Sequence, residues 1–434
     1  MKKMLRDIQQ LSKQQRWWLI VMIVGSLFLK FWMWYFVPAQ PFGPDASDYL
    51  RISELINQHG LSFWRSDDPN FLWRLPVLPI LISIFGGYQA LMILQLLCTY
   101  LLAYLVYKVF DKLTLQSAVS VFIGGFTLFL PYINIAACRI LTEFFQVLLI
   151  IYFLKKIFYQ EYDWRFSLAM VLVVFLRPEG YIYILFLLSR TLYVGYYRKL
   201  VVFVLPILCI VGWMTKNKQV YDTFSMVNPI MSSRALIGGI YPQINTKKSH
   251  PFHDKFNFYK ARDYVHSELF VKQYKQEVRK ELIQFLKDKP LIYLAYRVKS
   301  ILYSFSYIAF NEELMPDKNW RYQRKASYEQ VRKNNARWGY QTILTNKDWV
   351  RLLLRLMYNG SLLLMNFIGL FVILFNFRKL KVFIFTFMLF SFIAVVEVDM
   401  RYFLTIQLLC CCFFILGLRN LWLYRSLRLR VEKS

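Results

Sequence analysis

The feature that most constrains this chain is the length of its apolar blocks. Several reach the roughly 20 residues that an α-helix needs to cross a bilayer. Hydrophobic residues make up 57% of the sequence, too large a share for an ordinary soluble domain. The pattern predicts an all-α integral membrane protein with about ten transmembrane helices. The blocks lie at residues 17–38, 77–108, 115–133, 140–157, 166–196, 200–214, 352–377, 382–396 and 403–423.

Two blocks contain internal breaks. Gly86-Gly87 interrupts the block at 77–108, so we expect a short surface segment followed by a helix from residue 88 onward. Arg177-Pro178-Glu179-Gly180 interrupts the block at 166–196. A charged break at membrane depth is tolerated only where it faces protein or a wet cavity. This sequence therefore predicts a short helical hairpin whose tip points into the protein.

The basic residues of the short loops indicate the orientation. They fall on one side of the predicted helices, together with both basic termini, and such loops are typically cytoplasmic. We therefore expect a cytoplasmic (inner) membrane protein with both ends inside. The outer face then receives residues 39–76, 132–139, 215–351 and 397–402.

Three regions follow from this topology. Residues 1–214 form an N-terminal transmembrane module whose first outer loop, 39–76, carries a helix beside the membrane. Residues 215–351 form an external, mainly helical domain, with helices expected at Tyr274–Leu286 and Leu291–Phe305. Residues 352–434 form C-terminal transmembrane helices and a basic cytoplasmic tail.

Topology signals and attraction to anionic membrane lipids explain most of the net charge of +28, so no nucleic-acid partner is predicted. The remaining basic excess, in the long polar segment, would be served by a phosphate-bearing lipid. The cysteines lack the spacing of a metal site or a disulfide framework. No metal site is predicted, although carboxylates near a phosphate could recruit a divalent cation.

Asp45 and Asp48 are two carboxylates near the start of the first outer loop. Pro44-Asp45 is typical of a helix N-terminus, with Asp45 as the N-cap residue, and Gly60 is expected to end the helix. A capping carboxylate can still point into a cleft and act as a base, so both interpretations stay open. One face of this helix is apolar, with Tyr49, Ile52 and Ile56.

Arginines stand on four outer-face segments. Arg74 precedes two prolines and could bind either a lipid phosphate or a substrate phosphate. Arg139 and Glu143 have the i, i+4 spacing of an ion pair on one side of a helix, which must face protein or water. Arg177 and Arg401 are the other two. The convergence of these four arginines on one membrane interface indicates a functional site more specifically than any single motif does.

In order and topology, these elements resemble the GT-C superfamily of membrane glycosyltransferases, close to its protein O-mannosyltransferase and aminoarabinose transferase branch. The resemblance covers the membrane part, whereas 215–351 matches only as a helical external region. The matching elements are Asp45 with Tyr49, Arg74 with Pro76 and Pro79, Thr142 with Glu143, Arg177 to Gly180, and Arg401 with Tyr402. Two departures are that Pro131–Cys138 has no aspartate and that Ala46 follows Asp45.

The resemblance implies inverting transfer of a sugar from a polyprenyl-phosphate donor to an acceptor at the outer face. Asp45 would be the general base, assisted by Asp48 or Glu143, and Tyr49 and Tyr402 would support the site. The donor phosphate would be bound by Arg74, Arg139, Arg177 and Arg401. The acceptor, whether glycan, lipid or protein, is left open.

Two other functions fit parts of the sequence. An O-antigen polymerase or ligase is also polytopic with a large outer loop, but such an enzyme is expected to place catalytic arginine and histidine there. Here the histidines of that loop are His250, His253 and His266. A lipid or solute transporter would use broken helices at the bilayer midplane, and Arg177–Gly180 offers one such break without a paired break in a second half.

Overall fold

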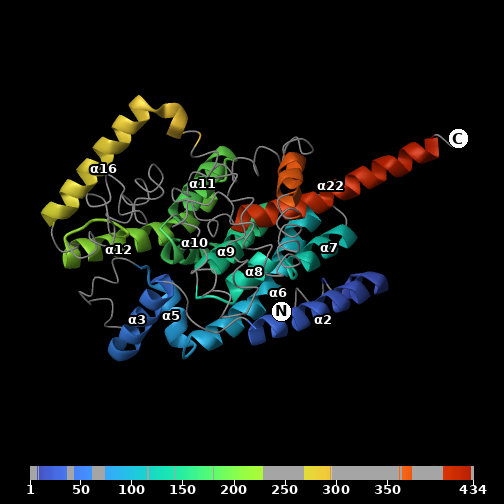
Figure 1. Cartoon of the computed structure of the whole chain (residues 1–434), viewed down its shortest axis with the longest axis horizontal. Helices are drawn as coiled ribbons and strands as arrows, with labels where there is room; N and C mark the ends of the chain where they lie inside the picture. The colour runs from blue at the N-terminus through green and yellow to red at the C-terminus, as the bar shows by residue number, and fades with distance from the viewer. Residues whose placement is uncertain are drawn as a thin grey trace, which may run out of the picture.

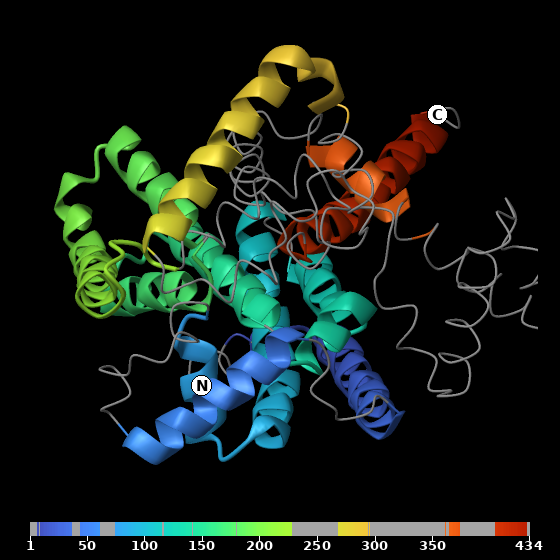
Figure 2. The same cartoon turned by 60° about the vertical axis from the view of Figure 1, so that its left-hand side comes forward.

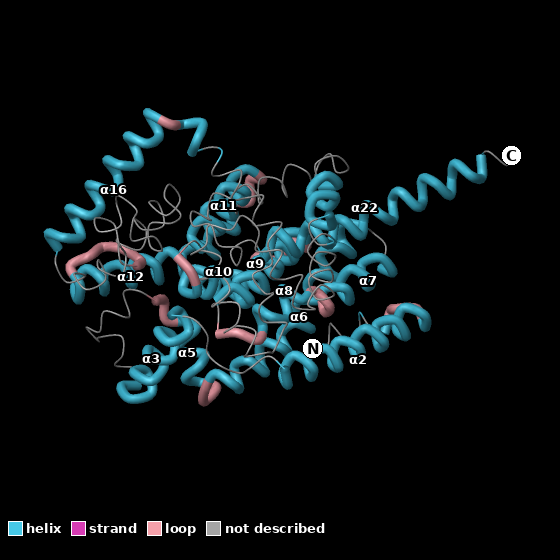
Figure 3. The backbone as a smooth tube through the Cα atoms, in the orientation of Figure 1, coloured by secondary structure: helices cyan, strands magenta, loops and turns pink. Residues whose placement is uncertain are grey.

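The computed structural model shows a helical protein (Figure 3). It describes residues 7, 9–36, 44–60, 74–114, 117–140, 142–178, 180–227, 268–293, 295, 361, 364–373 and 404–431. No strand occurs in these ranges, which confirms the all-α part of the prediction. The elements are α2 (Lys13–Phe36), α3 (Pro44–His59), α5 (Val77–Ile84), α6 (Tyr88–Thr114), α7 (Ser117–Thr127), α8 (Pro131–Ala137), α9 (Thr142–Phe158), α10 (Trp164–Leu176), α11 (Gly180–Tyr193), the 3-10 helix η2 (Tyr197–Phe203), α12 (Val204–Tyr221), α16 (Glu268–Asp288) and α22 (Leu404–Val431).

The glycine pair divides the apolar block at 77–108, as the sequence predicts. α5 ends at Ile84 and α6 begins at Tyr88. Between them Gly86 and Gly87 have φ angles of 71° and 136°, which residues with a side chain rarely adopt. The segment before the break is itself a helix, with Leu78, Pro79 and Ile82 buried.

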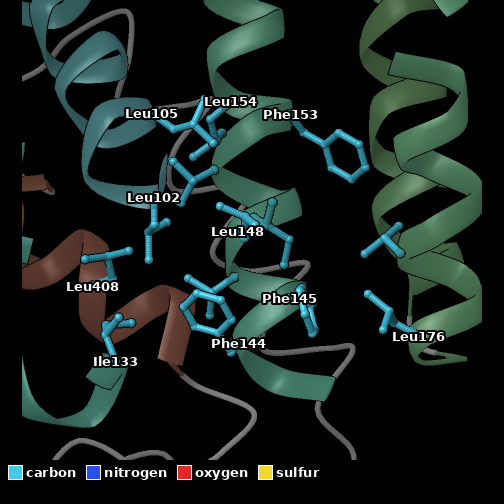
Figure 4. Close-up of a cluster of buried hydrophobic side chains, with 14 of the residues drawn as sticks. Leu102, Leu105, Ile133, Phe144, Phe145, Leu148, Phe153, Leu154, Leu176 and Leu408 are labelled. Carbon is cyan, nitrogen blue, oxygen red and sulfur yellow. The ribbon is translucent and has the colours of Figure 1, made fainter. Parts of the chain in front are cut away.

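α6 is the helix on which the others assemble. It packs against α5, α7, α8 and α9, while α9 also packs against α10 and α22. Figures 1 and 2 show α22 crossing these helices and then leading away from them. Figure 4 shows side chains from separate helices meeting in one buried cluster, among them Leu102, Leu105, Ile133, Phe144, Phe145, Leu148, Phe153, Leu154, Leu176 and Leu408. The same cluster includes Tyr49 of α3 and Leu75 just before α5, so it joins this part of the chain to the other helices.

Two described helical stretches, Tyr88–Leu113 and Tyr197–Val220, are long and apolar enough to cross a membrane. Shorter apolar helices lie at Ser117–Thr127, Trp164–Leu176, Leu364–Ile373 and Thr405–Arg419. The larger number of membrane helices expected from the sequence goes beyond this finding and stays a prediction.

The predicted external segment is described in part. α12 continues to Tyr221, beyond the predicted boundary at 214. α16, Glu268–Asp288, contains the helix expected at Tyr274–Leu286 and extends past both its ends. Outside the described residues lie most of 294–351 and the whole of 228–267, including His250, His253 and His266.

Candidate functional site

A buried ion pair joins α9 to the end of α10. Glu143 lies in the first turn of α9, and Arg177 follows Leu176 with an extended backbone that ends α10. The Arg177 Nη1 donates a hydrogen bond to Glu143 Oε1 across 3.0 Å. Glu143 is 4% exposed and Arg177 is 9% exposed. Two charges this deeply buried are stable only as partners.

The turn that carries Arg177 depends on a glycine. Gly180 begins α11, and a Cβ atom built there would lie 2.5 Å from the Val173 carbonyl oxygen of α10. The two helices therefore approach more closely than any residue with a side chain allows. This is the helical hairpin predicted from the sequence, and Arg177 at its tip is buried as expected. Glu179 lies outside the described residues.

The prediction that Arg139 and Glu143 lie on one side of the same helix is wrong. α9 begins at Thr142, so Arg139 lies in the turn before the helix and the i, i+4 spacing does not apply. The described ion-pair partner of Glu143 is Arg177, from the next helix. The buried Gln95 anchors this turn to α6. In the orientation that gives both its side-chain oxygen and its side-chain nitrogen suitable partners, the amide nitrogen donates hydrogen bonds to the carbonyl oxygens of Arg139 and Ala137 at 3.0 and 3.3 Å.

A second ion pair joins α3 to the segment just before α5. Arg74 Nε donates to Asp48 Oδ2 across 3.2 Å, and the Arg74 guanidinium lies over the Tyr49 ring, 5.4 Å from its centre. Asp48 and Tyr49 belong to α3, whereas Arg74 lies just before α5. α5 packs against both α3 and α10. Through α5, this pair is therefore connected to the helix that leads to Arg177.

The prediction that Asp45 is the N-cap residue is wrong, because the residue lies within the helix itself. α3 begins at Pro44, so Asp45 lies inside the first turn. Proline favours the first helical position because its missing N–H has no partner there anyway and its φ is already helical. A carboxylate in the first turn still interacts favourably with the helix dipole. The Asp45 side chain lies outside the described residues.

The rest of α3 follows the prediction. Tyr49, Ile52 and Ile56 are buried on one face, and Gly60 follows the helix with a φ of 55°. Arg401 and Tyr402, the late outer-face residues of the prediction, lie outside the described residues.

No protein-family model, curated protein or solved structure matches this chain. The assignment of roles therefore rests on its own residues and contacts. Among the described side chains, no three His, Cys, Asp or Glu form a group suited to a metal ion.

The opposite end of α9 is basic. Tyr159, just after α9, has the ammonium groups of Lys108, Lys112 and Lys155 at 5.3, 5.9 and 5.3 Å from its ring centre. Lys108 comes from α6 and also forms an ion pair with Asp7 at 3.2 Å. Short-loop cations that the sequence places on one face thus gather at one end of the helices. α9 has 17 residues, so Glu143 and this cluster stand roughly 20–25 Å apart along it.

Glu161 balances part of this basic cluster. It accepts a hydrogen bond from Lys155 and pairs with Lys156 at 3.3 Å. Burial raises the pKa of Glu161, but the hydrogen bonds and charges of Lys155 and Lys156 outweigh it and lower that pKa to about 2. Glu161 is therefore a carboxylate throughout the physiological range.

The sequence analysis missed Lys30. This α2 residue is 6% exposed, with its ammonium 4.7 Å from the centre of the Tyr100 ring. Ser26, one turn earlier on the same face, shares a 3.0 Å hydrogen bond with the Tyr100 hydroxyl. The signal was present as two polar residues at i, i+4 spacing in an otherwise apolar block.

Proposed function

We propose that this chain is an integral membrane glycosyltransferase of the GT-C type. The first support for a membrane location is the distribution of side chains on α2. Phe28 and Phe31 are 74% and 68% exposed, whereas Ser26 and Lys30 are buried against the protein. In water this arrangement is unfavourable, because the apolar face is solvated and the polar face is not. In lipid it is the favourable arrangement.

α12 has the same distribution. Leu205 and Leu208 are 46% and 63% exposed, whereas Lys216 and Asn217 are buried. Asn217 donates to the carbonyl of Ser225 across 2.7 Å. Polar side chains that turn inward to hydrogen-bond while leucines face outward are typical of helices in a bilayer.

The proposed topology follows from the two ends of α9. The basic end, with Lys108, Lys112 and Lys155 around Tyr159, faces the cytoplasm under the positive-inside rule. The end with Glu143 and Arg177 then faces outward. About ten helices would cross the inner membrane, with both termini in the cytoplasm and residues 215–351 outside.

The observation that carries the proposed activity is the pairing of the sequence motifs in space. The Thr142-Glu143 and Arg177–Gly180 motifs are joined by the buried ion pair. The Asp45–Tyr49 and Arg74 motifs are joined by the Asp48 ion pair and by the contact of Arg74 with the Tyr49 ring. Motifs far apart in the sequence that contact one another support a shared site more strongly than their order alone.

The proposed reaction transfers a sugar from a polyprenyl-phosphate donor to a hydroxyl or amine acceptor. Asp45 takes the proton from the acceptor, whose lone pair forms a bond to the anomeric carbon. The bond from that carbon to the phosphate oxygen breaks, and its electron pair stays on the polyprenyl phosphate. The products are the glycosylated acceptor, with inverted configuration, and the lipid phosphate.

Arg74 and Arg177 would stabilise the charge that develops on the leaving phosphate. A guanidinium has five N–H donors, so it can bind a carboxylate and a phosphate at once. On this proposal Asp48 and Glu143 orient the two arginines instead of acting as assisting bases. Arg139 and Arg401 stay phosphate-binding candidates, with Tyr402 in support.

The test is sugar transfer by the purified full-length protein in liposomes, supplied with a panel of radiolabelled polyprenyl-phosphate sugars and membrane extracts as acceptor. The control is protein carrying Asp45→Asn, which removes the proposed base and leaves the buried Glu143–Arg177 ion pair intact. We expect a labelled, extractable product with wild type that this variant reduces strongly. Specific binding of polyprenyl phosphates without transfer from any donor would instead favour a transporter.

A further inference from the structure

The buried face of α2 presents a cation to the interior of the protein. Met22, Ser26 and Lys30 follow one another at intervals of about one helical turn, and all three are buried. The Nζ of Lys30 is inaccessible to solvent and has no hydrogen-bond partner among the described residues. An ammonium has three N–H donors, and leaving them unpaired in a buried place is costly.

The neighbours of Lys30 compensate only part of this cost. Its contact with the Tyr100 ring, 4.7 Å from the centre, is favourable, but it offsets only part of the free-energy cost of burying an unpaired ion. Cys138 lies within electrostatic reach. Burial raises the pKa of the Cys138 thiol to about 12, even against the opposing effect of Lys30 and Arg139, so this thiol is neutral. The carboxylate of Glu143 is already paired with Arg177.

The position of Lys30 connects it to the candidate site. Cys138 and Arg139 form the turn before α9, and Gln95 of α6 holds this turn. Glu143 follows within one turn of α9. A cation with no anionic partner among the described residues thus lies beside the segment that leads into the buried Glu143–Arg177 ion pair.

We infer that Lys30 binds the phosphate of the lipid donor from within α2. This inference rests on the proposed function for the identity of the ligand. An anionic phosphate oxygen would supply the hydrogen-bond acceptors and the countercharge that Lys30 lacks. A helix whose other face meets lipid is suited to this role, because the donor's polyprenyl tail lies in the bilayer while its phosphate reaches protein.

The test is equilibrium binding of farnesyl phosphate, farnesol and inorganic phosphate to the purified full-length protein in nanodiscs. Wild type is expected to bind farnesyl phosphate at least about tenfold more tightly than farnesol, the preference that one charged hydrogen bond provides. Lys30→Met is expected to lose most of that preference with farnesol binding unchanged, and Lys30→Arg to keep it. Lys216→Met, which removes another buried lysine over an aromatic ring, is the matched control and should behave as wild type.

An unchanged preference in Lys30→Met overturns the inference, and so does equal binding of farnesol and farnesyl phosphate by wild type. Tighter binding of inorganic phosphate than of farnesyl phosphate overturns the assignment to a lipid. Because Lys30→Met could fail to fold, a second measurement uses wild type alone. In protein made with isotope-labelled lysine, farnesyl phosphate, but not farnesol, should shift the NMR resonance of the Lys30 ammonium nitrogen; an unshifted resonance contradicts the inference.

A failure of the proposed function can be distinguished from a failure of the proposed role of Lys30. If the phosphate preference depends on Lys30 but no donor supports sugar transfer by wild type, Lys30 is an anion site and the glycosyltransferase proposal is wrong. If wild type transfers sugar and Lys30→Met leaves the KM for the donor unchanged, the glycosyltransferase proposal stands and the role of Lys30 is wrong.

Discussion

Arg177 Nη1 donates to Glu143 Oε1 across 3.0 Å, although 34 residues separate them in the sequence. Both side chains are buried, and each comes from a motif that the sequence marks as functional. The contact fixes the start of α9 against the end of α10. It therefore determines where the other groups on these segments, including Arg139, are presented.

This contact predicts strong coupling between the two residues. Arg177→Met leaves a buried carboxylate without its countercharge, so we expect a loss of about 3–5 kcal/mol in stability. The double variant Glu143→Gln with Arg177→Met should lose less, because neither charge is then isolated. Chemical unfolding of the purified protein in detergent, arranged as a double-mutant cycle, measures this coupling. Additive losses in the cycle contradict a direct ion pair.

The tight turn between α10 and α11 predicts that Gly180 cannot be replaced. Gly180→Ala places a methyl group 2.5 Å from the Val173 carbonyl oxygen, and we expect a loss of about 1–3 kcal/mol together with reduced sugar transfer. Gly212→Ala in α12 is the matched control, since no atom lies within 4 Å of its added Cβ. That control should be neutral, or more stable by up to about 1 kcal/mol. Equal thermal stability of the two variants would show that the hairpin is not packed as described.

The contacts of Arg74 predict that a lysine cannot substitute for it. Lys keeps the charge that pairs with Asp48 but loses the planar group that lies over the Tyr49 ring. The ion pair is partly exposed, so Arg74→Lys should change stability by less than about 1 kcal/mol. The KM for the donor should rise by about tenfold, the loss of one charged hydrogen bond. Arg51→Lys, at an exposed position of α3, is the control; an equal KM in both variants contradicts a role of Arg74 at the phosphate.

The basic cluster predicts an acid-dependent loss of stability. The pKa of Glu161 is lowered from 4.5 to about 2 in the folded protein, so its ion pairs contribute stability above pH 4.5 or so. That contribution is lost as the pH falls toward about 2, because the folded state must then bind the proton that the unfolded state already holds. Glu161→Gln should flatten this part of the profile of melting temperature against pH. A variant profile parallel to that of wild type between pH 5 and pH 2 would exclude this contribution.

The sequence predicts well those parts of the fold that local chemistry determines. Gly86-Gly87 ends one helix and starts another because only glycine adopts its backbone angles easily, and the buried face of α3 follows from helical spacing. The partner of Glu143 could not be predicted in this way. The short distance along the chain between Glu143 and Arg139 favoured Arg139 as the partner. Packing of α9 against α10 instead brings Arg177 into contact with Glu143. Lys30 was missed for the same reason, because burial of its ammonium depends on α6 and on the turn before α9.

The most direct test of the account is sugar transfer by Asp45→Asn beside wild type and Asp48→Asn, in liposomes with the donor identified by the panel. We predict that Asp45→Asn lowers kcat by about 10²–10⁴-fold, the contribution of a general base, while donor binding is retained. Asp48→Asn should keep most of its kcat and raise the KM for the donor, because it loses the group that orients Arg74. Transfer by Asp45→Asn at the wild-type rate would contradict Asp45 as the base and, with it, the central claim about how this site works.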